Sequence, residues 1–215
     1  MGKYDTVIFD LDGTLLNTLE DLKDSVNYAL ESAGMPLRTL EEVRGFVGNG
    51  VKRLMELAVE GGMENPKFEE VFEVFRQYYS GHCNDKTGLY PHIMELLEAL
   101  NRRGYKLAIV SNKYYDAVQE LKELYFKEYI SVAIGEKEGI RKKPAPDTVI
   151  EALKELGSRR ESSVYVGDSE VDIATAKNAG MDCIVVTWGF RTKEEQKRAG
   201  GRVFADDPLE ILDLL

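Results

Sequence analysis

Short apolar runs alternate with amphipathic segments over most of this chain. The first run, residues 4–9, is β-branched and aromatic without polar alternation, which suits a strand buried on both faces of a parallel sheet. Further strands are predicted at 107–110, 131–134, 163–166, 183–187 and 202–204, and helices at 94–100, 116–124, 146–156, 171–179 and from 208 onwards. Repeated strand–helix units of this length predict an α/β fold: a doubly wound parallel sheet, or Rossmann-like core.

Residues 16–85 differ from the rest of the chain, because their apolar residues recur at helical spacing only. Helices are predicted at 18–33, 39–46, 51–59 and 66–79, with a break at Gly48-Asn49-Gly50. The chain is therefore predicted to form a catalytic core from residues 1–15 and 86–215, with an all-helical cap domain inserted as residues 16–85. Linkers near 15–18 and 84–89 are expected to let this cap close over a site.

Composition narrows the possible partners and compartment. The 215 residues include 38 acidic and 28 basic side chains, a net charge of -10, which argues against nucleic acid or an anionic membrane as the main partner. The two cysteines, Cys83 and Cys183, lie far apart, as is typical of a reducing compartment. No apolar run is long enough to span a membrane and no secretory signal is evident, so a soluble cytoplasmic protein is expected. The sequence does not indicate an oligomeric state.

Polar residues follow the predicted strands where the strands end, which is where parallel sheets bind ligands. Asp10 and Asp12 follow the first strand; side chains two residues apart on an extended chain point the same way, so these carboxylates are expected to converge and to need a cation or proton. Ser111 and Asn112 follow the second strand, just before a helix whose free amides suit an anion. A simple helix N-cap is the alternative for this pair.

Two further motifs complete the candidate site. Lys143 ends a basic cluster, residues 141–143, and the prolines that follow restrict the backbone before a helix. In residues 165–172 an apolar strand is again followed by glycine, Asp168 and Asp172. Oxygen ligands of this kind suit Mg²⁺, which keeps waters and shares phosphate oxygens. We expect Asp10, the backbone carbonyl of Asp12, and Asp168 to bind the metal, with Asp172 supporting them from behind.

The four motifs together resemble those of the haloacid dehalogenase-like hydrolase superfamily. The matching residues are Asp10-x-Asp12-Gly13-Thr14, Ser111-Asn112, Lys143-Pro144 and Gly167-Asp168-x-x-x-Asp172. The helical insertion resembles the first type of cap in that superfamily, and Val47-Gly48-Asn49-Gly50 is similar to the cap loop of phosphoglycolate phosphatases.

This resemblance implies a mechanism and a substrate class. It implies that Asp10 attacks phosphorus to form an aspartyl phosphate, that Asp12 is the general acid and base, and that Ser111, Asn112 and Lys143 hold the transferring oxygens. A small anionic phosphomonoester is expected as substrate, with phosphoglycolate the best single guess. Gly48 and Asn49 of the cap loop are expected to contribute to substrate binding, for example by presenting helix amides to a carboxylate.

Several alternatives remain open at this point. A phosphomutase of the β-phosphoglucomutase type keeps both aspartates, but related sugar phosphomutases place an arginine where Gly48-Asn49-Gly50 stands here. A pyrophosphatase is also compatible. A phospho-accepting receiver switch, a different class, lacks the helical insertion and does not need Asp12.

Other polar and aromatic residues are expected to play lesser parts. His82 and His92 are expected to be structural or exposed, and Trp188, Phe190 and Arg191 to pack. Lys113 is a further candidate for a position near the phosphate.

Overall fold

The protein was analysed as a computed structural model that describes residues 3–215, so the first two residues of the predicted core lie outside the description. The chain forms two compact units. One unit comprises Met1–Leu15 and Leu89–Leu215, and the other Leu16–Gly88. The second division falls at Leu89 rather than at the predicted residue 86, and each unit is described separately below.

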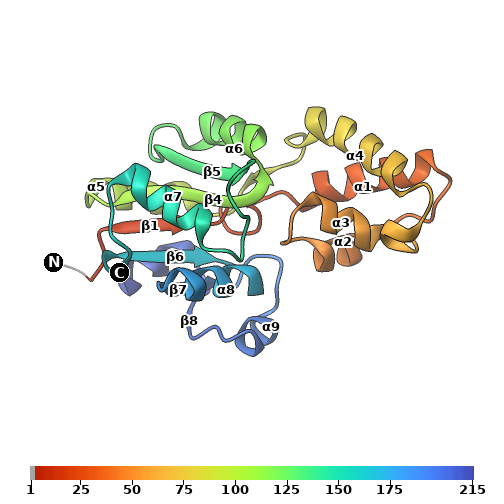
Figure 1. The fold of residues 1–215 in the computed structure, drawn as a ribbon. Coiled ribbons are helices and arrows are strands. Elements are labelled where there is room, and N and C mark those ends of the chain that lie inside the picture. The colour runs from red at the N-terminus through yellow and green to blue at the C-terminus, as the bar shows by residue number, and fades with distance from the viewer. Residues whose placement is uncertain (1–2) are drawn as a thin grey trace. The chain divides into compact units, whose positions relative to one another are not determined.

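The larger unit, called the core unit, is built on a parallel sheet of six strands in the order β5-β4-β1-β6-β7-β8 (Figure 1). The strands are β1 (Thr6–Phe9), β4 (Lys106–Tyr114), β5 (Val132–Glu136), β6 (Ser163–Gly167), β7 (Asp182–Val186) and β8 (Val203–Ala205). The prediction of an α/β fold with a doubly wound parallel sheet is confirmed.

Strand β1 lies between β4 and β6, so the strand order reverses beside it. Phe9, the last residue of β1, is in register with Ile109 of β4 and with Val166 of β6. The residues that follow these three positions therefore emerge side by side at the carboxyl edge of the sheet, at the point where α/β folds bind ligands.

Helices cover the core sheet because both of its faces are apolar. The core helices are α5 (Ile93–Arg102), α6 (Tyr115–Leu121), α7 (Asp147–Leu156), α8 (Glu170–Ala179), α9 (Lys193–Arg198) and α10 (Ile211–Leu214). Helices α7 and α8 pack against each other and against the sheet (Figure 1). Ile8, Val110 and Tyr165 lie in the cluster with these two helices. Their strand neighbours Phe9 and Ile109 are fully buried as well, as expected for a sheet covered on both faces.

The smaller unit, called the helical unit, contains α1 (Leu19–Ser32), α2 (Leu40–Phe46), α3 (Val51–Ala58) and α4 (Phe68–His82). Helix α1 packs along α4 and contacts α2. Thr39 and Glu42 form a capping box that starts α2. Two short strands, β2 (Leu16–Asn17) and β3 (Gly88–Leu89), pair at the ends of this segment. Among residues 3–215, no helix is long and apolar enough to cross a membrane.

Two elements differ from the sequence-based prediction. Strand β4 continues past the predicted residue 110 to Tyr114, with an irregular register after Val110, so Ser111 and Asn112 lie in the strand and do not cap a helix. Helix α9 was not predicted, because its six residues carry a single buried side chain, Gln196, and no apolar periodicity.

Candidate active site

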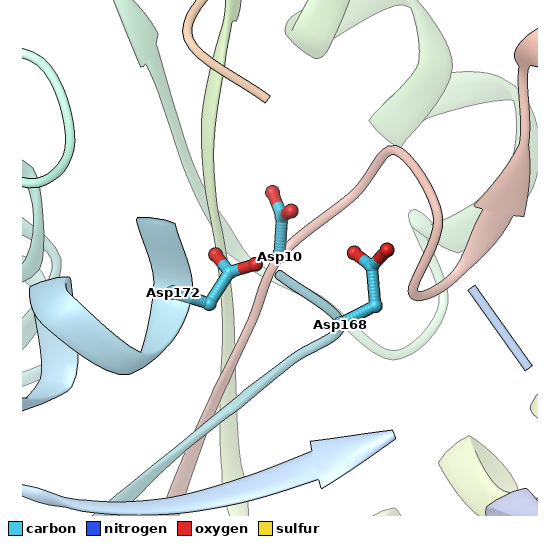
Figure 2. A group of neighbouring side chains, drawn as sticks. All are labelled: Asp10, Asp168 and Asp172. Atoms are coloured by element: carbon cyan, nitrogen blue, oxygen red, sulfur yellow. The ribbon is translucent and has the colours of Figure 1, made fainter. Parts of the chain in front are cut away.

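Three carboxylates from two different segments meet at the carboxyl edge of the core sheet. Asp10 follows β1, Asp168 follows β6, and Asp172 lies in the first turn of α8 (Figure 2). Each offers an oxygen within 4.8 Å of the others, and all three side chains are buried. Among the described residues, this is the group of acidic, histidine or cysteine side chains that could hold a metal ion.

Glycines allow the loops of this site to approach one another closely. Gly13 has a φ of +89°, and a Cβ atom there would lie 2.7 Å from Asp168 Oδ2. A Cβ atom on Gly189, in the loop after β7, would lie 2.4 Å from the Asp168 Cβ and from the Gly13 carbonyl oxygen. Both loops therefore press directly on Asp168, and a larger residue at either position would displace it.

A buried ammonium connects two of the carboxylates. Lys143 Nζ lies 2.7 Å from Asp10 Oδ1 and 2.8 Å from Asp172 Oδ1. It also donates to the Tyr165 hydroxyl at 3.1 Å, and that hydroxyl donates to Asp172 at 3.0 Å. Burying an ammonium is costly unless it is paired, and here two carboxylates balance it. Lys143 thus fixes the direction of the Asp10 carboxylate.

The oxygens of Asp172 are occupied by protein donors. Oδ2 accepts from the Ser169 backbone N–H at 3.0 Å and from the Ser169 hydroxyl at 2.6 Å, which forms the capping box of α8. Oδ1 accepts from Lys143 and Tyr165. This geometry suits a supporting carboxylate better than a metal ligand.

Burial disfavours the charged forms of the other two carboxylates, Asp10 and Asp168. Burial raises the pKa of Asp168 to about 7, and the negative charge of Asp172 adds to the rise. Burial and Asp172 also hold the pKa of Asp10 well above its usual range, although Lys143 opposes them. The pKa of Asp172 is lowered in spite of its burial, because Lys143 and Ser169 favour its charged form. Buried oxygen donors whose charged forms are disfavoured fit a small, hard divalent cation such as Mg²⁺.

Asp12 belongs to a second ion pair in the core unit. Its Oδ1 lies 3.1 Å from Lys113 Nζ, and the two side chains are 16% and 2% exposed respectively. Its Oδ2 lies 3.5 Å from the Ser111 hydroxyl. Asp10 and Asp12 thus have separate lysine partners, and the Asp12 carboxylate is not among those that cluster with Asp168.

Asn112 binds the backbone of the loop that carries Lys143. Its amide oxygen accepts from the Lys143 N–H at 2.8 Å, and its amide nitrogen donates to the Lys143 carbonyl at 3.0 Å. Ser111 accepts at its hydroxyl from the Lys113 N–H at 3.1 Å. The two residues after the predicted strand therefore both organise the site, and Asn112 does so by holding a second motif in place.

Some residues that hold the site were not identified from the sequence. The Phe190 N–H donates to Asp168 Oδ2 at 2.6 Å, and the Trp188 indole donates to the Thr14 carbonyl at 3.0 Å. Gln196 of α9 donates to the backbone carbonyls of Asp168 and Val186, both at 2.7 Å. Backbone donors and a lone glutamine carry no sequence pattern, although the position of residues 188–190 after β7, at the ligand-binding edge, does point to this site.

The remaining candidates are described within their own units. Gly48 and Asn49 lie in the helical unit, in the loop between α2 and α3, where Gly48 has a φ of 127°. His82 and His92 are partly exposed and bind Asp85 and Asp207 at 2.7 and 2.6 Å. The two histidines thus have the exposed positions expected from the sequence.

Comparison with known proteins adds an independent line of information. A family model described as haloacid dehalogenase-like hydrolase matches residues 7–186. The phosphoglycolate phosphatase of Aquifex aeolicus is 33% identical over 185 residues, which cover 86% of this chain and 85% of that protein.

Solved structures are similar over their whole length. A crystal structure from Lactobacillus delbrueckii subsp. bulgaricus is 39% identical with a TM-score of 0.94, covering 99% of this chain and 98% of that one. The structure of a predicted phosphoglycolate phosphatase from Haemophilus somnus is 30% identical with a TM-score of 0.91, covering 100% and 99%.

Proposed function

Because the chain belongs to the haloacid dehalogenase-like hydrolase family and is a phosphatase within it, we propose that it hydrolyses a small phosphomonoester through an aspartyl phosphate formed on Asp10. The observation that carries this proposal is the position of Asp10: its buried carboxylate lies against Lys143 and in the same cluster as Asp168, at the switch point of the sheet. A carboxylate held in this way can attack phosphorus in line.

The first half of the reaction forms the covalent intermediate. An oxygen of Asp10 attacks phosphorus, the ester P–O bond breaks, and the leaving oxygen takes a proton from Asp12. In the second half, water gives a proton to Asp12 and attacks the same phosphorus, the bond to Asp10 breaks, and inorganic phosphate leaves. The separate lysine partners of Asp10 and Asp12 support this division of labour, because each carboxylate is held in its own orientation.

Divalent metal is part of the proposal. Asp10 and Asp168, together with the backbone carbonyl of Asp12, would hold Mg²⁺, while Asp172 supports Lys143 and the start of α8. When bound, Mg²⁺ offsets the negative charge shared by the nucleophile and the phosphoryl group. The raised pKa of Asp168, about 7, supports this assignment, since a cation relieves the cost of its buried charge.

Phosphoryl oxygens would be held by Ser111, Asn112 and Lys143. The Lys143 ammonium already lies beside the nucleophile, so it can offset charge on the transferring group as well. Asn112 contributes by fixing the backbone of Lys143. Gly48 and Asn49 of the helical unit, which come just before the first turn of α3, would contact the substrate from the cap loop, since backbone amides at the start of a helix suit an anion.

Phosphoglycolate is the proposed substrate. The names of relatives that align over most of the chain support it, as does the similarity of residues 47–50 to the cap loop of phosphoglycolate phosphatases. Its product, glycolate, is a small anion, in keeping with a site that carries two buried lysines.

A phosphate-release screen tests the proposal. Phosphoglycolate, glycerol phosphate, glucose phosphates, pyrophosphate and p-nitrophenyl phosphate would be compared with and without Mg²⁺. The expected result is sustained, Mg²⁺-dependent release with the highest kcat/KM for phosphoglycolate, and loss of turnover by several orders of magnitude in Asp10→Asn without a change in fold.

Other outcomes would contradict it in distinct ways. Release of one equivalent only would indicate a receiver-type switch. Isomerisation of glucose phosphates without net phosphate release would indicate a mutase, and retained turnover in Asp10→Asn would exclude this nucleophile.

A further inference from the structure

Lys113 is a buried ammonium that the proposed reaction does not use. Its side chain is 2% exposed, and it leaves β4 two residues after Ser111 at the same edge of the sheet. A lysine is rarely buried without a specific function or partner, because desolvating the ammonium is costly. Its position in the core unit therefore calls for an explanation beyond packing.

The location of Lys113 is defined by Asp12. The ammonium lies 3.1 Å from Asp12 Oδ1, whereas Lys143, the other buried lysine of the site, contacts Asp10 and Asp172. The two lysines thus serve different sides of the reaction. Lys143 is beside the nucleophile, and Lys113 is beside the residue that must reach the leaving oxygen.

This geometry limits what can lie next to Lys113 during the reaction. In the proposed mechanism the ester oxygen forms a hydrogen bond with the Asp12 carboxylate, and Oδ1 of that carboxylate lies 3.1 Å from the Lys113 ammonium, so the ester oxygen and the ammonium are neighbours of the same side chain. A group bonded one carbon away from that oxygen falls within reach of the ammonium. The carboxylate of phosphoglycolate stands at this position.

On these grounds we infer that Lys113 is a specificity-determining residue, which binds a negative group on the leaving-group side of the substrate, next to the ester oxygen. The inference rests on the proposed function and names a substrate class: phosphomonoesters whose leaving group carries a carboxylate or a similar anion. A neutral hydroxyl at the same place would gain less, because it carries no net charge to attract the ammonium.

Matched substrates test this inference in the full chain with Mg²⁺. 2-Phosphoglycolate and 2-hydroxyethyl phosphate differ only in the carboxylate, and 2-phosphoglycerate and glycerol 2-phosphate form a second such pair with the carboxylate at the same distance from the ester oxygen. In the wild-type protein kcat/KM should favour the carboxylates. In Lys113→Met, which keeps the length of the side chain, this preference should fall by about tenfold or more, and Lys113→Arg should restore part of it.

The control variant is Lys106→Met. Lys106 begins the same strand at its other end, is exposed, and binds backbone carbonyls of Leu156 and Gly157. The Lys106→Met substitution removes one cation from β4 at the end far from the carboxyl edge, so this variant should keep the substrate preference of the wild-type protein.

Binding of stable analogues gives a second readout, independent of turnover. 3-Phosphonopropionate keeps the carboxylate and propylphosphonate lacks it. Calorimetry should show that Lys113→Met weakens the first by about tenfold or more and the second much less.

The outcomes separate this inference from the proposed function. If Lys113→Met lowered kcat/KM equally for esters with and without the carboxylate, Lys113 would merely position Asp12. If the preference for carboxylates stayed unchanged, Lys113 would not contact the substrate. Either result overturns this inference but leaves the proposed function standing. Absence of phosphate release from every ester, including p-nitrophenyl phosphate, overturns both.

Discussion

The side-chain amide of Asn112 pairs with both backbone groups of Lys143, accepting from its N–H at 2.8 Å and donating to its carbonyl at 3.0 Å. Lys143 in turn lies 2.7 Å from the proposed nucleophile, Asp10. Two motifs that are 31 residues apart in the chain are therefore joined by one amide. The position of the ammonium depends on this pairing.

Replacing Asn112 tests that dependence. Asn112→Ala leaves two backbone groups of the buried Lys143 without these partners, so we expect a loss of about 1–3 kcal/mol in the free energy of unfolding, together with a lower kcat. Denaturant unfolding and steady-state kinetics measure the two effects. Asn178→Ala is a matched control, since its amide donates to the carbonyl of the next residue, Pro144, but is exposed. Equal costs for the two variants would contradict the expectation.

Replacing Asp12 should reveal its role as an acid. Asp12→Asn cannot donate the proton, so kcat/KM should fall by about 10²–10⁴-fold for phosphoglycolate, whose alkoxide is a poor leaving group. p-Nitrophenolate leaves without protonation. For p-nitrophenyl phosphate, the rate of the first half of the reaction should therefore fall clearly less than it does for phosphoglycolate. Burst and steady-state kinetics on both esters separate the two steps. If both esters lost the same factor in the burst, Asp12 would not be the acid.

Metal binding should depend on pH through Asp168. Its pKa is raised to about 7 by burial and by Asp172, compared with about 3.9 in an unfolded chain. The metal-free folded protein thus binds the Asp168 proton more tightly than the unfolded chain does. The free energy of unfolding that this proton contributes is therefore lost as pH rises from about 4 through about 7. Above that range Mg²⁺ compensates the buried charge of Asp168, but below it Mg²⁺ must displace a proton.

The measurement is the rise in Tm caused by a fixed concentration of Mg²⁺. It should be larger at about pH 8 than at about pH 5.5, since metal affinity falls as the ligand is protonated. Asp168→Asn should show little rise at either pH. A rise that is independent of pH in the wild-type protein would argue against Asp168 as a ligand.

The close approach at Gly189 leads to a further prediction. A Cβ atom there would lie 2.4 Å from the Asp168 Cβ, so Gly189→Ala should force these backbones apart, with a loss of about 1–3 kcal/mol and weaker Mg²⁺ binding. Gly81→Ala is the control, because Gly81 lies in α4 with nothing within 4 Å of the added atom. Alanine there should stabilise the helix by up to about 1 kcal/mol. Thermal unfolding and metal titration of both variants provide the test.

The sequence predicts the ends of β1 and β6 well, because a buried parallel strand is a continuous run of apolar residues. The apolar runs before Asp10 and Asp168 identify both strands, and the topology of a doubly wound sheet then brings their ends together. The pairing of Asp12 with Lys113 does not follow from that argument. Which of two nearby lysines binds which of two aspartates depends on side-chain directions at the end of β4, where the register is irregular.

Other features could not be predicted for the same physical reason. Gln196 supports Asp168 from a helix of six residues that has no apolar stripe, and Phe190 does so with its backbone N–H, which every residue but proline possesses. Such contacts are set by the tertiary fold and leave no trace in the local pattern of residue types.

Asp172 ties the chemistry to the integrity of one helix. The carboxylate that balances Lys143 also begins α8, through its two contacts with Ser169. Fraying of the first turn of α8 would therefore remove one of the two carboxylates that bind the Lys143 ammonium. The nucleophile Asp10 would then lose its fixed orientation while the sheet stays intact. Mild heat or denaturant should inactivate the protein before it unfolds globally, so its activity would report on the order of a single helical turn.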